Sequence, residues 1–179
     1  MRILDLANVI LRWGPVRATR RNHALEHATV HVLQERYPEL RVSGYSTPQG
    51  FALIGNLPEQ ATEQAVHEAL KRLREGQHQL ALHPQCGTNL AVQVLLCTLI
   101  GLLGFSGVGW RRALNRVNPV SMLVLLTTLF APILGMYTQK HLTTNGDVGS
   151  LEIHSAFQQK WKFPLVGTIA IQIVRTKYG

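Results

Sequence analysis

The sequence predicts an α+β protein, with a small soluble domain of two helices and a short, mostly antiparallel sheet into which a transmembrane helical hairpin is inserted. Three observations favour this fold class. Helix-period segments and short strand-like segments follow one another in the first half of the 179 residues. Two long uncharged apolar runs occupy the middle of the chain. A strand-like run rich in isoleucine and valine comes near the C-terminus.

These segments divide the chain into three expected parts. Residues 1–89 form a soluble α+β part that starts with an amphipathic helix, and residues 90–139 form a two-helix transmembrane hairpin. Residues 140–179 return strands to the soluble domain. One ordinary domain plus a membrane anchor fits this chain length, so no further domain is expected.

The net charge of +8 does not by itself indicate a nucleic-acid-binding protein. Residues 1–89 hold ten Lys or Arg against eight Asp or Glu, and the excess comes from Arg111, Arg112, Arg116 and the C-terminal part. Basic residues beside apolar segments are typical of membrane proteins, and no zinc-finger spacing or basic heptad region is present. The expected partner is the lipid bilayer, with a protein partner in the membrane as a further option, and not nucleic acid.

Residues 3–13 have apolar side chains at helical spacing, and Gly14-Pro15 is expected to end this helix. No small-residue cleavage site follows, so we expect an amphipathic or packing helix rather than a signal peptide. It would lie on the membrane surface or on the soluble domain. A second helix is predicted from about Thr19 to Arg36, where Tyr37-Pro38 stops it.

The segments LRVSGYST and GFALIG, separated by Pro48-Gln49, predict two strands in a hairpin. A helix is predicted from Pro58 to Gly76, with acidic residues early and basic residues late. Its inner face is expected to consist of Ala65, Ala69, Leu70 and Leu73, with His67 solvated. A further strand is predicted from Gln79 to Leu82.

The runs Leu90–Trp110 and Val117–Gln139 contain no charged residue, and the arginines lie in the segment between the two runs. At about 1.5 Å per residue, each is long enough to cross a hydrocarbon core of about 30 Å. Two buried core helices of a soluble protein would need more covering residues than this chain has. The first run has glycines that predict close helix packing, and the second has residues that predict a kink: Gly101, Gly104, Gly107 and Gly109, then Pro132 and Gly135.

The strand-like run from Val166 to Val174 is too short to span a membrane. We expect it to pair with the earlier strands, so that both chain halves build the soluble domain. Glu152 and His154 would then approach the same sheet and are outside candidates for site residues.

The histidine-rich helix carries the strongest chemical signal. His23, His27 and His31 recur every four residues on one side of the helix, with Glu26 beside them. Within this pattern, H-x-x-E-H places two metal-competent imidazoles one turn apart, and its carboxylate could take a proton from a water that the metal activates. His31 is about 12 Å along the axis from His23, but it could pair with His27. The alternative is a set of histidines that are solvated or only hydrogen-bonded.

The turn LHPQCGTNL offers a third ligand. Its cysteine, Cys86, is the preferred candidate, with His83 second, because thiolate and imidazole are zinc ligands. The alternative is a turn that only stops a strand and caps a helix, with Thr88 or Asn89 as the N-cap. Cys86 and Cys97 do not form a disulfide framework and are expected to be reduced.

With the helix HALEHATVHVL, the strand GFALIG and the turn HPQCGTNL in view, most of the chain resembles an uncharacterised bacterial membrane-protein family with two spans. That resemblance implies the fold but no activity. A weaker one, to inverted zincins of the pitrilysin type, implies that His23 and His27 bind zinc and that Glu26 is the general base. Those peptidases are much larger and take a third ligand from a downstream glutamate, for which only Glu63, Glu68 and Glu75 are available here.

Two functions follow as hypotheses. The first is a membrane-anchored zinc hydrolase, most simply a peptidase, in which His23, His27 and Cys86 hold the ion and Glu26 is catalytic. The second is a non-enzymatic membrane assembly or accessory subunit, whose histidine helix is structural or binds a metal or tetrapyrrole passively. A pore or transporter ranks last, because the only ionisable residues of the spans are Cys97 and Tyr137.

We expect a two-span protein of the cell membrane. The arginines between the spans favour a cytoplasmic loop. The reduced cysteines and the missing signal peptide favour instead a cytoplasmic soluble domain, and this second orientation is the one that we expect.

Overall fold

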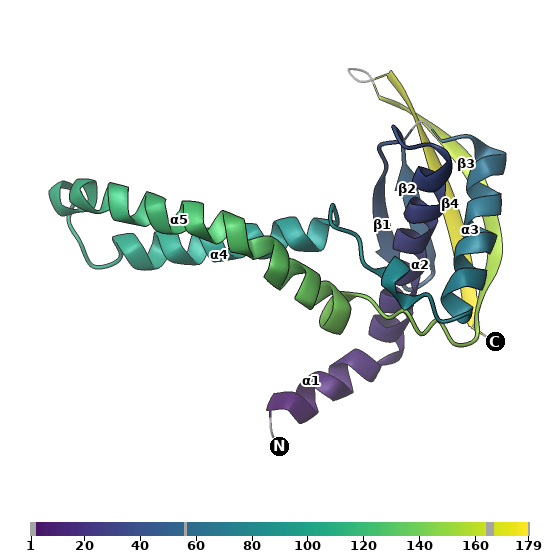
Figure 1. Cartoon of the computed structure of the whole chain (residues 1–179), viewed down its shortest axis with the longest axis horizontal. Coiled ribbons are helices and arrows are strands. Elements are labelled where there is room, and N and C mark those ends of the chain that lie inside the picture. Colours follow the sequence, from purple (N-terminus) through teal and green to yellow (C-terminus); the bar gives the residue numbers. More distant parts are fainter. Residues whose placement is uncertain (1–2, 56, 164–166, 179) are drawn as a thin grey trace. The chain divides into compact units, whose positions relative to one another are not determined.

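The computed structural model describes residues 3–55, 57–163 and 167–178. It confirms the predicted fold class, because helices accompany an antiparallel sheet and two long apolar helices form a hairpin. The chain separates into two compact units (Figure 1). The α/β unit comprises Met1–Leu82 and Leu142–Gly179, and the hairpin unit comprises His83–His141.

Among the described residues, the α-helices of the α/β unit are α1 (Ile3–Arg12), α2 (Gly14–Arg36) and α3 (Glu59–Arg74). All three were predicted, but α2 begins at Gly14 rather than near Thr19. Pro15 lies in its first turn, where the missing N–H of proline has no helical acceptor to lose. Gly14-Pro15 therefore starts the second helix as well as ending the first.

Four antiparallel strands form one sheet in the order β1-β2-β4-β3: β1 (Ser43–Thr47), β2 (Gly50–Ile54), β3 (Leu151–Phe163) and β4 (Gly167–Tyr178). The β1–β2 hairpin is confirmed, and so is the pairing of the C-terminal run with it, through Phe51 opposite Val174. Strand β3 was not predicted, because Ile153 is its single β-branched residue. Its register with β4 along nearly its whole length supplies the support that local propensity lacks.

Helices α2 and α3 lie side by side on one face of the sheet (Figure 1). The core between the layers is closed by large side chains that are fully buried: Leu25, Leu33, Leu53, Leu73, Leu151 and Val174. The predicted inner face of α3 is confirmed, since its four residues are buried while His67 is exposed. This packing fixes which side of α2 is left for its histidines.

The predicted strand at Gln79–Leu82 is wrong. The chain forms a single 3-10 turn there, η1 (His78–Ala81). The carbonyl groups of Ala81 and Leu82 accept hydrogen bonds from His27 and His31 of α2 rather than from a neighbouring strand. The apolar pattern of a four-residue segment does not distinguish between these two kinds of partner.

The hairpin unit consists of α4 (Gly87–Phe105) and α5 (Trp110–Thr138), and α5 continues into a π-helical turn, η2 (Gln139–Thr143). Both helices are long and apolar enough to cross a membrane, and little of their apolar surface is buried. This exposure argues against two core helices of a soluble protein and indicates a membrane protein.

Close packing of α4 on α5 is confirmed at one of the four predicted glycines. A Cβ on Gly104 would lie 2.5 Å from Val120, whereas nothing lies within 4 Å of a Cβ at the other three. On α5, Gly135 has no room for a side chain because Asn89 lies against it. Helix α5 runs through both Pro119 and Pro132, and the kink at Pro132 stays a prediction.

Candidate metal centre

His23 and His27 lie one turn apart on α2 and contact each other. Their ring centroids are 4.3 Å apart, with the ring planes at 63°. His27 is 3% exposed, and His23 is half-buried. Because Leu25 and Ala28 take the core side of α2, the two imidazoles are left together on another side of the helix.

Backbone carbonyl groups hold both rings through the same nitrogen. Nδ1 of His23 donates to Thr143 O at 3.0 Å, and Nδ1 of His27 donates to Ala81 O at 2.7 Å. A carbonyl oxygen can only accept, so in the neutral ring Nδ1 carries the proton and Nε2 carries the lone pair. This is the arrangement by which proteins orient an imidazole as a metal ligand.

His31 is held the other way round. Its Nε2 donates to Leu82 O at 2.9 Å, which leaves the lone pair of the neutral ring on Nδ1. His31 is also outside the metal-capable group found among the described residues. The suggested pairing of His31 with His27 is therefore not found.

Cys86 is the N-cap of α4. Its Sγ accepts a hydrogen bond from the backbone N–H of Thr88 at 3.4 Å. The prediction of Thr88 or Asn89 as the cap is wrong, because the helix already begins at Gly87. His83 is tied into the same turn, where its Nδ1 accepts from the backbone N–H of Gln85.

His23, His27 and Cys86 form a group that could hold a metal ion. Zinc takes imidazole nitrogens and thiolate sulfur at about 2.0–2.3 Å in a tetrahedral arrangement. His83 and Glu26 do not belong to this group.

Glu26 turns its carboxyl group toward β1. Ser46 Oγ donates to Glu26 Oε2 at 2.5 Å, and Glu26 is 5% exposed. Burial raises the pKa of this carboxyl above its ordinary value, while the hydrogen bond from Ser46 and the neighbouring His23 oppose the rise. Gly44 makes room for the carboxyl, since a Cβ there would lie 1.9 Å from Oε1.

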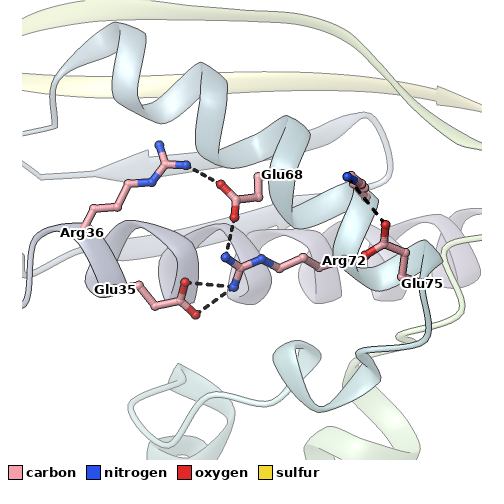
Figure 2. Close-up of polar contacts among 6 residues, drawn as sticks. Glu35, Arg36, Glu68, Arg72 and Glu75 are labelled. Carbon is pink, nitrogen blue, oxygen red and sulfur yellow. Dashed lines mark hydrogen bonds and ion pairs between the residues drawn. The ribbon is translucent and has the colours of Figure 1, made fainter.

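The downstream glutamates that the zincin resemblance would need do not belong to the metal-capable group found among the described residues. Glu68 of α3 accepts from Arg36 and Arg72, and Arg72 also donates to Glu35 (Figure 2). The hydrogen bond from Arg72 is the main reason why the pKa of Glu68 is lowered. Glu75 pairs with Lys71, and Glu63 is exposed.

The outside candidates on β3 also lie apart from this group. Glu152 is exposed and pairs with Lys177 at 3.5 Å, and His154 is exposed. Neither belongs to the metal-capable group found among the described residues.

Sequence reasoning missed the residues that hold the cysteine turn. Gln139 is fully buried, accepts from the backbone N–H of His83 and donates to its carbonyl oxygen, both at 3.0 Å. Asn89 donates to Pro84 O at 2.7 Å and accepts from Gln139. An uncharged polar residue at the end of each apolar run was the available signal.

A model of a domain of unknown function, DUF6391, matches residues 18–156. The chain belongs to this family. The DUF6391 region contains the histidine pair, the cysteine turn and both apolar helices. The likeness to inverted zincins stays a prediction.

One curated relative is an uncharacterized protein of Picosynechococcus sp. (strain PCC 7002), which is 41% identical over 137 residues. The match covers 70% of this DUF6391 chain and 65% of the relative, so the chain spans less than two thirds of that protein. No solved structure matches.

Proposed function

We propose that this DUF6391 protein is a two-span membrane protein that binds one zinc ion through His23, His27 and Cys86 and hydrolyses a substrate, most simply a peptide. The observation that carries the proposal is the histidine pair of α2, whose ring centroids are 4.3 Å apart and which could hold a metal ion together with Cys86. Imidazole and thiolate are the ligands that zinc prefers. Three protein ligands leave the fourth tetrahedral position for water or substrate, as in catalytic zinc sites.

The hydrogen bonds of the histidines support this proposal. Their two carbonyl acceptors fix the ring orientations and leave Nε2 as the basic nitrogen in each ring. Ala81, the acceptor for His27, comes five residues before Cys86 in the chain. The chain therefore runs past the histidines shortly before it reaches the thiol.

Glu26 is the proposed general base. A zinc ion supplies Lewis acidity, which makes a water reactive near neutral pH. Glu26 precedes His27 directly and is close enough to His23 for the histidine to influence its carboxyl. Ser46 fixes one carboxyl oxygen, so that this side chain is oriented before it accepts a proton.

The burial of Glu26 favours a second candidate function. A carboxyl group that is 5% exposed and accepts a hydrogen bond from Ser46 also fits a purely structural role, in which it ties α2 to β1. The protein would then be an assembly or accessory subunit that meets a protein partner in the membrane. Its histidines would bind a metal or tetrapyrrole without turnover, or be structural.

Metal content and turnover together test the proposal. Protein purified in detergent with zinc in the buffer is analysed for bound metal as wild type, His27→Ala and His67→Ala. We expect about one zinc per chain in wild type and loss of zinc in His27→Ala. His67→Ala is the control and should keep its zinc, because His67 is exposed in the wild type. Absence of stoichiometric zinc from wild type would contradict the proposal as a whole.

Glu26→Gln then separates the two candidate functions. With a proteome-derived peptide library as substrate, we expect this variant to keep its zinc and to lose turnover by about a hundredfold or more. A wild type that binds zinc and cleaves no peptide would overturn the peptidase and leave the accessory subunit.

We further propose that α4 and α5 span the cell membrane with the α/β unit in the cytoplasm, where the thiols stay reduced. The arginines at 111–116 argue for the reverse. Ser106→Cys in a chain that lacks both native cysteines tests this with a membrane-impermeant maleimide. Labelling in intact cells is expected, whereas labelling only after lysis would reverse the orientation.

A further inference from the structure

The hairpin unit has a groove between α4 and α5, close to the loop that joins them. Its volume is about 490 Å³, and its walls are apolar apart from one arginine, Arg116. Ile100, Leu103, Val120 and Leu123 contribute to these walls. Gly104 also lines the groove, at the point where α4 packs closely on α5: a Cβ there would lie 2.5 Å from Val120.

Arg116 brings a charge to this apolar groove. One of its N–H groups donates to Gly104 O at 3.0 Å, which is a carbonyl of the last turn of α4. A guanidinium has five N–H donors in a rigid fork, so this bond uses only a small part of its capacity. The bond fixes the side chain beside the groove.

A second arginine lies on the same face of α5. Arg112 is exposed and precedes Arg116 by four residues, which is about 6 Å along the helix. No Asp or Glu occurs between Glu75 and Asp147, so the sequence of the hairpin unit contains no acid to neutralise these arginines. Any anion that pairs with these arginines must therefore come from outside the hairpin unit.

We propose that this groove binds one acyl chain of an anionic phospholipid and that Arg112 and Arg116 bind its phosphate. The apolar walls suit a hydrocarbon chain, and a guanidinium binds phosphate oxygens through paired hydrogen bonds. Basic pockets between membrane helices bind acidic headgroups in this way. The site belongs to the hairpin unit alone and is independent of the proposed metal centre.

Native mass spectrometry of the detergent-purified full chain tests this site, with equal amounts of phosphatidylglycerol and phosphatidylcholine added. The expected result is a preference of wild type for phosphatidylglycerol. Arg116→Gln should reduce this preference about fivefold, which corresponds to about 1 kcal/mol for one arginine near an anionic lipid. Arg111→Gln is the matched control, because it removes the same charge about 140° around the helix from Arg116.

Two further arms distinguish a lipid held by its acyl chain from a phosphate group held by the arginines alone. Leu123→Trp keeps both arginines and fills the groove, so it should also reduce lipid binding; helical circular dichroism checks that each variant is folded. Glycerol phosphate should not compete with the lipid. No preference in wild type, equal losses in Arg111→Gln and Arg116→Gln, or full competition by glycerol phosphate would each overturn the proposal.

Discussion

The middle and the C-terminal end of α2 hold their polar side chains in opposite ways. In the middle of the helix, His27 is buried and His23 half-buried, and each ring donates to a backbone carbonyl oxygen. In the last turns, Glu35 and Arg36 are exposed and reach two charged residues of α3, Glu68 and Arg72 (Figure 2). One helix therefore carries hydrogen-bonded polar side chains inside and a charged network outside.

This difference shows which polar side chains of α2 depend on particular hydrogen-bond partners. A buried polar group is costly unless it is hydrogen-bonded, so the interior histidines require particular acceptors at particular places. Exposed ion pairs contribute about 0–1 kcal/mol each and tolerate exchange. Substitutions in the first group should therefore change both stability and binding, and substitutions in the second group should change little.

The largest effect is expected at Gly44. A methyl group there meets the carboxyl of Glu26, so Gly44→Ala should lower the free energy of unfolding by about 2–3 kcal/mol. Chemical unfolding of the full chain in detergent measures this change. Gly14→Ala is the control, because nothing lies within 4 Å of a Cβ there. An equal and small effect in both variants would show that Glu26 does not lie against β1.

A smaller loss of about 1–3 kcal/mol is expected for His27→Ala measured without metal, because the buried Ala81 carbonyl loses its donor. His67→Ala should change the free energy of unfolding by less than about 0.5 kcal/mol, since His67 is exposed. If the two variants were equally stable, the hydrogen bond at His27 would not support the fold.

Glu68→Gln should give the smallest change, about 0.5 kcal/mol near pH 7. Arg72 lowers the pKa of Glu68 in the folded state, so its contribution is fully present above the unfolded pKa of about 4.3 and is lost as the pH falls through the lower folded pKa. The stability difference between wild type and Glu68→Gln should therefore vanish in acid. A difference that grows as the pH falls would contradict this assignment.

The elements that could be predicted from the sequence are those whose own periodicity is sufficient. The apolar face of α3 and the spacing of His23 and His27 are local patterns, and both appear as expected. The β1–β2 hairpin is likewise encoded in two adjacent segments.

The missed features depend on partners that are distant in the chain. Nothing local distinguishes η1 from a strand, because the acceptors at 81–82 bond to rings about fifty residues away. Ser46 and Gly44 look like ordinary hairpin residues until Glu26 lies against them. Cys86 was selected for its chemistry, and its role as the cap of α4 became visible only with the helix boundary.

X-ray absorption at the zinc edge tests the central claim most directly. For the detergent-purified wild type loaded with zinc, the spectrum should fit two imidazole nitrogens at about 2.0–2.1 Å and one sulfur at about 2.3 Å. Cys86→Ser should lose the sulfur shell, while Cys97→Ser should leave the spectrum unchanged. A wild-type spectrum without sulfur, or one that Cys86→Ser leaves unaltered, would contradict a zinc ion held by His23, His27 and Cys86.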